Sequence, residues 1–177
     1  MKTCALYGFI SALAGAFLVL ILYFLGFHSD PAKLGTAQAI GTIAGLAIVI
    51  VVIALGVKAR REEVPAEEEF GYGATLRAGV LISLVAAILS AIFTYAYHAF
   101  INPGFSNILV QDAVGKMEAK GISGAQLDKI ESFDRVIFSP VAMAAIALIM
   151  GFIIGVIISL IVAAFLKRPA PAQPPAV

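Results

Sequence analysis

Four long apolar stretches, separated by charged segments, dominate the sequence. They cover about residues 5–27, 35–57, 78–101 and 140–166. Because an α-helix rises about 1.5 Å per residue, about 20 apolar residues cross the roughly 30 Å hydrocarbon core of a bilayer. All of the stretches reach that length. The pattern therefore predicts an all-α fold, an integral membrane four-helix bundle that forms one domain over residues 1–168.

The composition supports a membrane protein and argues against nucleic acid as a partner. The 177-residue chain is 61% hydrophobic and 13% charged, with a mean hydropathy of +1.00, which lies outside the usual range of a water-soluble domain. Its charged residues lie outside the apolar stretches, and no basic patch predicts nucleic-acid binding. A single cysteine, Cys4, excludes an intramolecular disulfide and a thiolate metal cage. We therefore expect no metal site.

The basic residues predict the orientation in the membrane, because Lys and Arg near the ends of spans resist translocation. The first stretch is expected to be a retained helix, since it is longer than the apolar region of a signal peptide and no small-x-small cleavage site follows it. With four spans, one side of the membrane receives Lys2, Lys58, Arg60, Arg61, Arg77, Lys167 and Arg168. Both termini are thus predicted to be cytoplasmic.

Capping and turn residues predict where helices begin and end. Asp30 with Pro31, and Ser139 with Pro140, each place a capping side chain before a proline at the first helical position. These pairs are predicted to start the second and fourth spanning helices. The third is predicted to end at Asn102, because Pro103 disfavours a helical conformation in the residue before it.

The outer segment, residues 103–138, is predicted to form two short amphipathic surface helices between spans three and four. Ser106 is expected to cap the first of them, and Ser123 with Gln126 forms a capping box for the second. The second helix carries one apolar stripe of Leu127, Ile130, Phe133 and Ile137. We expect both helices to lie on the outer membrane surface or to fold back over the bundle.

Two further polar segments are expected to be irregular. The link over residues 58–77 contains an acidic run and is interpreted as a solvated loop. Residues 169–177 form a Pro-rich tail that is predicted to be disordered.

Small residues at helical spacing are the strongest candidates for a functional surface. Gly41 and Gly45 lie on one face of the second span, and Gly151, Gly155 and Ser159 lie on one face of the fourth. Such faces let another helix backbone approach closely, which matters because lipid provides no hydrophobic drive for helix association. They serve either packing within the bundle or contact with another protein.

One candidate polar site lies at the end of the third span. His98 follows Tyr95 and Tyr97 and precedes Asn102. Ionisable residues within a membrane often mark a proton path or a ligand site, whereas amphipathic rings near a span end usually anchor the helix at the headgroups. We favour the anchor for His98 and likewise for His28, and a proton or ligand site is the alternative.

Motifs of catalysis and cofactor binding are absent from the sequence. Gly71-Tyr-Gly73 lacks the third glycine of a dinucleotide fingerprint and follows an acidic loop instead of a strand. The sequence contains no Walker loop, no His-Glu-x-x-His and no nucleophile elbow. We expect a protein that is not an enzyme and holds no cofactor.

Two segments of the chain resemble a known family. The first runs from Gly71-Tyr-Gly73 through Arg77 to the third span, which closes with Tyr-Ala-Tyr-His-Ala-Phe-Ile-Asn-Pro-Gly-Phe. The second is the fourth span with its Ser139-Pro140 start and its Phe-Leu-Lys-Arg end. Both are similar to a bacterial four-span membrane family of unknown function, the one numbered forty-one ninety-nine. The resemblance covers about residues 5–168, and it implies four spans and a bacterial inner-membrane location without any site.

Two functions remain open at this stage. The first is a structural or accessory subunit that contacts other membrane proteins, or copies of itself, through its helices. The alternative is a small oligomeric transporter or channel. Its path would use the polar residues of the spans, which are Ser83, Ser90, Thr94, Gln38 and Thr42.

Overall fold

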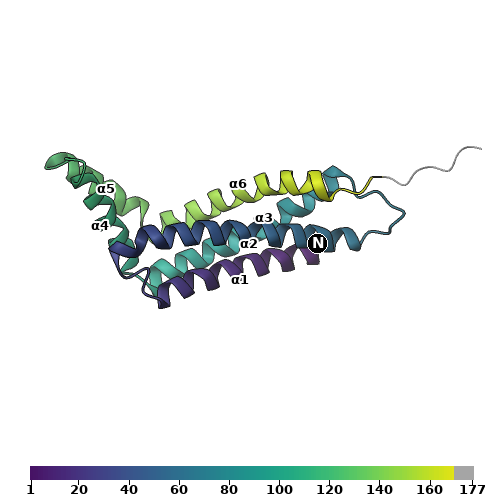
Figure 1. Cartoon of the computed structure of the whole chain (residues 1–177), viewed down its shortest axis with the longest axis horizontal. Coiled ribbons are helices and arrows are strands. Elements are labelled where there is room, and N and C mark those ends of the chain that lie inside the picture. The colour runs from purple at the N-terminus through teal and green to yellow at the C-terminus, as the bar shows by residue number, and fades with distance from the viewer. Residues whose placement is uncertain (170–177) are drawn as a thin grey trace, which may run out of the picture.

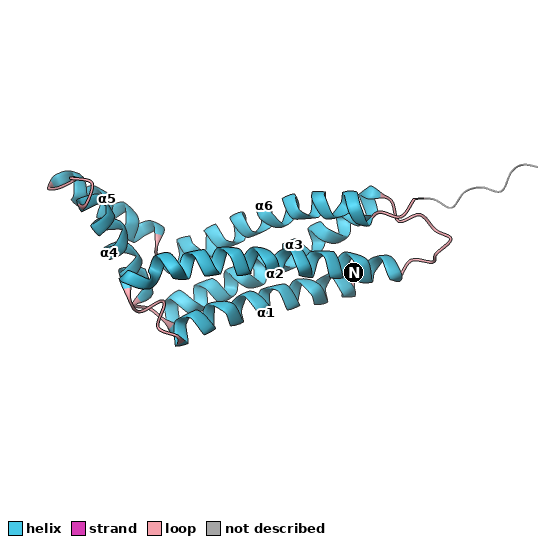
Figure 2. Cartoon of the chain, viewed as in Figure 1, coloured by secondary structure: helices cyan, strands magenta, loops and turns pink. Residues whose placement is uncertain are grey.

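The computed structural model describes residues 1–169, and four long helices dominate it (Figure 1). They are α1 (Lys2–Phe24), α2 (Leu34–Glu62), α3 (Tyr72–Ala96) and α6 (Pro140–Leu166). Each is long and apolar enough to cross a membrane. The predicted class, an all-α bundle of four apolar helices, is confirmed (Figure 2). The predicted Pro-rich tail, beyond Pro169, lies outside the described residues.

The four long helices run antiparallel to their neighbours in sequence (Figure 1). α3 packs most extensively on α6, then on α1 and then on α2. One end of the bundle holds the start of α1 and the end of α6, and we call it the terminal end. The opposite end carries α4 (Phe105–Glu118) and α5 (Ala125–Ile137), and we call it the hairpin end.

The predicted helix starts at Asp30 and Ser139 are confirmed. The Asp30 carboxylate accepts a hydrogen bond from the Ala32 amide at 3.0 Å, at the start of a short 3₁₀ turn, η1 (Pro31–Lys33), that leads into α2. The Ser139 hydroxyl accepts from the Ala142 amide at 3.4 Å at the start of α6. In both cases a proline occupies the first turn. An N–H group there would have no hydrogen-bond partner within the helix, so the proline costs no helical hydrogen bond.

The third span ends in a wider turn that the sequence pattern does not predict. α3 continues into a π-helical segment, η2 (Tyr97–Ile101), and the chain leaves the helix at Asn102, as expected from Pro103. The Asn102 amide donates to the Tyr97 carbonyl at 2.7 Å, five residues back. A π-helical turn inserts one extra residue, so it rotates the side chains that precede and follow it.

Two short helices do follow η2, but the predicted caps are wrong. α4 begins after Gly104 and α5 begins after Gly124, and neither start has a side-chain cap. Gly124 has φ of +62°, a left-handed conformation that lets the chain enter α5 without Ser123 as a cap. The Ser106 hydroxyl instead bonds His98, so a tertiary partner competes successfully with the local backbone.

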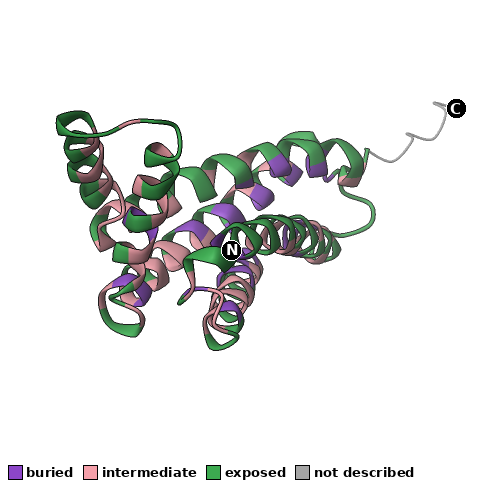
Figure 3. Ribbon diagram, turned by 60° about the vertical axis from the view of Figure 1, so that its left-hand side comes forward, coloured by how far each residue is buried: buried purple, intermediate pink, exposed green. Residues whose placement is uncertain are grey.

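The α4–α5 hairpin leans away from the bundle and is mostly exposed (Figures 1 and 3). α4 buries Leu109 and Val110, whereas no residue of α5, within the described chain, is buried. Leu127, Ile130 and Ile137 of the predicted apolar stripe are half-buried, and Phe133 is 66% exposed. That the hairpin lies on a membrane surface remains a prediction.

The hydrophobic core lies at the terminal end. Its buried members come from every long helix and from the link between α2 and α3, and they are Cys4, Ile53, Val57, Phe70, Ala78, Ile82, Ile158 and Val162. Phe70 pairs with Arg168 through two backbone hydrogen bonds of 3.1 and 2.8 Å. The Arg168 guanidinium donates to the carbonyls of Val64, Pro65 and Glu68, which joins the acidic link to the end of α6.

Candidate functional site

A close helix contact joins α3 and α6 through two reciprocal pairs. Gly155 lies against Ser83, and a Cβ added to Gly155 would come within 2.5 Å of the Ser83 side chain. Gly79 lies against Ser159 in the same way, at 2.6 Å. Each serine donates to the carbonyl of the glycine one turn earlier, and the two hydroxyls are 3.4 Å apart. The antiparallel pair is thus held by small residues and satisfied hydroxyls, as is usual between membrane helices.

Two further close contacts involve glycines that the sequence pattern does not single out. A Cβ on Gly8 of α1 would lie 2.6 Å from Cβ of Val85 on α3. A Cβ on Gly56 of α2 would lie 2.6 Å from Cδ1 of Ile82 and 2.8 Å from Cβ of Tyr7. Gly56 belongs to no small-x-x-x-small pair in its own helix, and Gly8 forms one only with Ala12, so the tertiary fold is needed to identify both contacts.

The remaining predicted packing glycines have more space around them. A Cβ on Gly151 would lie 3.9 Å from Cβ of Ala87, which is an ordinary contact. One on Gly41 would lie 4.0 Å from Cδ1 of Leu22, and one on Gly45 would meet no described atom within 4 Å. Of the predicted set, Gly155 and Ser159 are buried in the close contact, and the others border open space.

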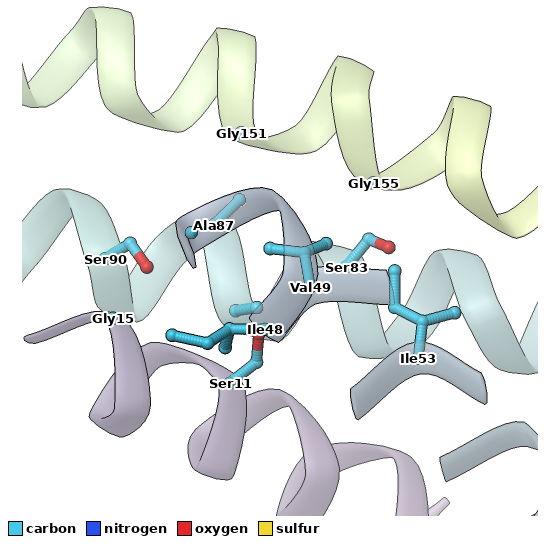
Figure 4. Close-up of a pocket in the computed structure, with 12 residues that line it drawn as sticks. Ser11, Gly15, Ile48, Val49, Ile53, Ser83, Ala87, Ser90, Gly151 and Gly155 are labelled. Carbon is cyan, nitrogen blue, oxygen red and sulfur yellow. The ribbon is translucent and has the colours of Figure 1, made fainter. Parts of the chain in front are cut away.

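Some of that space is a cavity of about 190 Å³ in the middle of the bundle, between all four long helices (Figure 4). The cavity exists partly because glycines, which have no side chain, contribute to its lining. These glycines are Gly15, Gly45, Gly151 and Gly155. Its polar groups are hydroxyls, from Ser11, Ser83 and Ser90. The cavity is otherwise apolar, and no charged residue lines it.

A buried polar cluster lies at the hairpin end, where the loop after α1 meets η2 and α4. His28 Nδ1 lies 2.6 Å from the Tyr97 hydroxyl, to which the Asn102 side-chain amide donates at 3.2 Å. His98 Nδ1 lies 3.1 Å from the Ser106 hydroxyl. The three ring residues are buried, with exposed fractions of 2% for Tyr97, 4% for His98 and 7% for His28. The candidate polar residues His98 and Asn102 therefore belong to one cluster with His28.

Aromatic rings enclose this polar cluster. Phe105 stacks on His28, with ring centroids 4.4 Å apart and planes 23° from parallel. The edge of Tyr97 meets the His28 and Phe105 rings at centroid distances of 5.7 and 5.9 Å. His98 lies 5.5 Å from Phe105. The hydrogen bonds are thus held in a surrounding of low polarity, where they are stronger than in water.

The hydrogen-bond directions determine which nitrogen of His28 carries the proton. The Asn102 amide nitrogen can only donate, so the Tyr97 oxygen accepts from it. Because Tyr97 is buried, its own proton requires an acceptor, and His28 Nδ1 is the acceptor within reach. Burial lowers the pKa of His28 below its ordinary value, which favours the neutral ring. Neutral His28 therefore carries its proton on Nε2.

A second cavity, of about 270 Å³, adjoins the cluster. Part of its lining is formed by His28, Tyr97, His98 and Phe105. The rest comes from α1, α3 and α6 and is apolar except for Thr94. Among residues 1–169 no group of three or more His, Cys, Asp and Glu side chains is placed to hold a metal ion. The chemistry available at this cavity is hydrogen bonding and ring stacking.

The sequence pattern identified only part of this cluster. His98 and Asn102 can be found from the sequence because a histidine and an amide near a span end are uncommon. No local pattern places Tyr97, Phe105 and Ser106 beside them. The π-helical turn brings Tyr97 and His98 into the interior next to each other, with both residues buried. Strict helical periodicity cannot predict that placement, because it assumes an uninterrupted α-helix.

The four long apolar helices are consistent with a multi-pass helical membrane protein. The chain belongs to the family described as "Protein of unknown function (DUF4199)", whose model matches residues 6–168. This match confirms the resemblance read from the sequence. No curated protein and no solved structure matches the chain.

Proposed function

We propose that this DUF4199 protein is an accessory subunit that acts through helix–helix contacts with another membrane protein. The observation that carries the proposal is a polar strip on the outer surface of α2. Gln38 and Thr42 are exposed, although they belong to the uncharged stretch between Lys33 and Lys58. They lie about one and a half and two and a half turns from Lys33.

An amide and a hydroxyl on a lipid-facing surface are unfavourable, because hydrocarbon offers them no hydrogen-bond partner. Polar side chains of this kind associate with polar groups on a neighbouring helix. Gly35 and Ala39 are exposed on the same part of α2, and a Cβ on Gly35 would meet no described atom within 4 Å. Small residues there allow a partner helix to approach the Gln38 amide closely.

The proposal places the protein in a bacterial inner membrane with both termini in the cytoplasm. The basic residues at the terminal end support this orientation, because Lys and Arg near span ends resist translocation. The partner is another membrane protein or a second copy of the chain. No catalytic activity is proposed, because the sequence contains none of the motifs that carry catalysis.

The first experiment is gentle detergent purification of the tagged native protein, with determination of its mass and of every protein that co-purifies. A stoichiometric partner is expected with the wild-type chain, and Gln38→Leu should release it. Thr36→Leu is the matched control, because Thr36 is also exposed on α2 but points to the opposite side of the helix. A wild-type monomer, or a complex that survives Gln38→Leu, would contradict the proposal.

The second candidate function is a small oligomeric transporter or channel. The observation that favours it is the line of hydroxyls along α3, since Ser83 and Ser90 border the central cavity and Thr94 borders the next cavity towards the hairpin end. A homo-oligomer without other partners would make flux assays in vesicles the decisive test. Solute-specific flux that Ser90→Leu abolishes would support this function over the accessory role.

A further inference from the structure

We propose that the cavity at the hairpin end binds an uncharged lipid whose flat ring carries hydrogen-bond acceptors, a head of the isoprenoid-quinone class. This inference goes beyond the proposed contact function and uses a different surface from the polar strip of α2. It rests on four features of this cavity. They are a hydrogen-bond donor on His28, a wall of aromatic rings, a described lining without charged residues, and an apolar opening.

The donor is the Nε2–H group of His28. Both histidines of the cluster bond protein partners through Nδ1 only. Within residues 1–169 no fully buried side-chain nitrogen or oxygen is without a hydrogen-bond partner. The Nε2 atoms of His28 and His98 must therefore reach accessible space, and both residues line the cavity. Since neutral His28 carries its proton on Nε2, it offers a donor to a carbonyl oxygen of the ligand.

The aromatic wall favours a flat ring. Phe105 lies between the two histidines, stacked on His28 at 4.4 Å and 5.5 Å from His98, and Tyr97 closes the wall with its edge. Phe93 extends the lining along α3. Rings in proteins pack by offset stacking and by edge-to-face contact, and this wall presents surfaces for both.

The lining favours an uncharged head over the head of an anionic phospholipid. It contains no Lys, Arg, Asp or Glu among the described residues. Burial also lowers the pKa of His28, which keeps that ring neutral near pH 7. A phosphate would lose its hydration here without gaining a cation, whereas a carbonyl needs only the hydrogen bond from His28.

The apolar side of the cavity leads to the outer surface of the bundle. Val19 of α1 and Met143 and Ile146 of α6 form it, and Ile146 is 39% exposed. An isoprenoid tail can therefore leave the cavity directly into the hydrocarbon of the bilayer. The volume of about 270 Å³ is at the lower limit of small-molecule sites, so it accommodates the ring while the tail stays outside.

The test is binding of decyl-ubiquinone, a ubiquinone ring on a short saturated tail, to the purified full chain by equilibrium dialysis in detergent. Saturable binding of one molecule per chain is expected. His28→Phe keeps a ring against Phe105 and removes the donor, and it should weaken binding about tenfold. Absence of saturable binding to the wild-type protein, or unchanged affinity in His28→Phe, would overturn the proposal.

A matched pair on α6 separates this cavity from the outer surface of the protein. Ala147 lines the cavity, and Ala145 lines a groove between α3 and α6 that does not include the polar cluster. Ala147→Leu should block binding, and Ala145→Leu should leave it intact. The reverse result would place the ligand in the outer groove and overturn the proposal.

Two further readouts complete the test. Melting temperature and elution volume identify any variant that does not fold, and the affinity of decyl-ubiquinone is compared only among folded variants. Phosphatidylglycerol, a lipid with an anionic head in place of an uncharged ring, is tested as a competitor. Displacement of decyl-ubiquinone by stoichiometric phosphatidylglycerol would show that the head is selected by its charge, against the proposal.

Discussion

The two halves of the bundle are built from similarly apolar helices, yet they pack differently (Figure 3). In α6 the buried residues all lie between Gly155 and Ala163, towards the terminal end. In α3 they lie between Thr75 and Ala87, which is the matching half of that antiparallel helix. The described parts of α3 and α6 nearer the hairpin end contain no buried residue. The buried residues at that end belong to other elements: His28, Tyr97 and His98 of the polar cluster, and the apolar residues Leu22, Leu34, Ala37, Leu109 and Val110.

This difference indicates that the two ends of the bundle have different roles. At the terminal end, glycines of α3 and α6 lie directly against serine side chains of the facing helix, so a small change in volume has to move a side chain or a helix. Near the hairpin end, cavities and surface grooves border α3 on both sides, and at the terminal end a pocket of about 210 Å³ lies beside Cys4, Phe70 and Ala78. Binding and exchange of small molecules need such space, whereas a close-packed contact maintains the scaffold.

The largest expected effect tests the close packing. Gly155→Ala should lower the free energy of unfolding by about 2–3 kcal/mol, because its Cβ would lie 2.5 Å from the Ser83 side chain. Gly151→Ala is the matched control, with 3.9 Å to Cβ of Ala87, and it should have little effect. Thermal melting in detergent measures both. Equal melting temperatures for the two variants would mean that the terminal end is no tighter than the middle of the bundle.

The next effect concerns the polar cluster. Tyr97→Phe removes the hydroxyl that joins His28 to Asn102, and should destabilise the fold by about 1–2 kcal/mol because both groups lose their partner. Tyr95→Phe is the control, since Tyr95 is 42% exposed. Melting curves and hydrogen exchange across residues 97–106 measure the change. If Tyr97→Phe were as stable as Tyr95→Phe, the cluster would not contribute to stability.

A smaller effect is expected at the terminal end outside the core. Arg168→Ala removes the donor to three carbonyls of the acidic link, and should cost about 1 kcal/mol, since the bonds are largely exposed. The link should then be cleaved faster by a protease. Lys167→Ala is the neighbouring control, because Lys167 is exposed. The claim that Arg168 fixes the link fails if both variants are cleaved at the wild-type rate.

Features that depend on nearby residues could be predicted from the sequence. The four long helices follow from hydropathy, and the starts at Asp30 and Ser139 follow from capping chemistry with a proline in the next position. The end at Asn102 follows from Pro103. Each of these depends on side chains within a few residues of the boundary, which is the range over which local rules operate.

Features that depend on distant partners could not be predicted. Gly8 and Gly56 are critical only because Val85, Ile82 and Tyr7 face them from other helices. Ser106 satisfies the local rule for a cap but bonds His98 instead. In these cases the competing partner lies far away in the chain or beyond an irregular turn. The fold class could therefore be predicted from the sequence, whereas the residues of the candidate site could be predicted only in part.

The smallest expected effect is a dependence of stability on pH at the hairpin end. Burial lowers the pKa of His28 in the folded chain below the usual 6.5, so the unfolded chain takes up this proton at higher pH. Stability contributed by neutral His28 is thus complete above about pH 6.5 and declines as the pH falls towards the folded pKa. Protonation also turns Nδ1 into a donor, which leaves the Tyr97 proton without its acceptor.

Melting temperatures of the wild type and His28→Phe between pH 5 and 8 measure this contribution, with His98 common to both proteins. A wild-type curve that stays parallel to the His28→Phe curve on the acid side would show that His28 is not held neutral, and the donor assigned to its Nε2 would have to be abandoned.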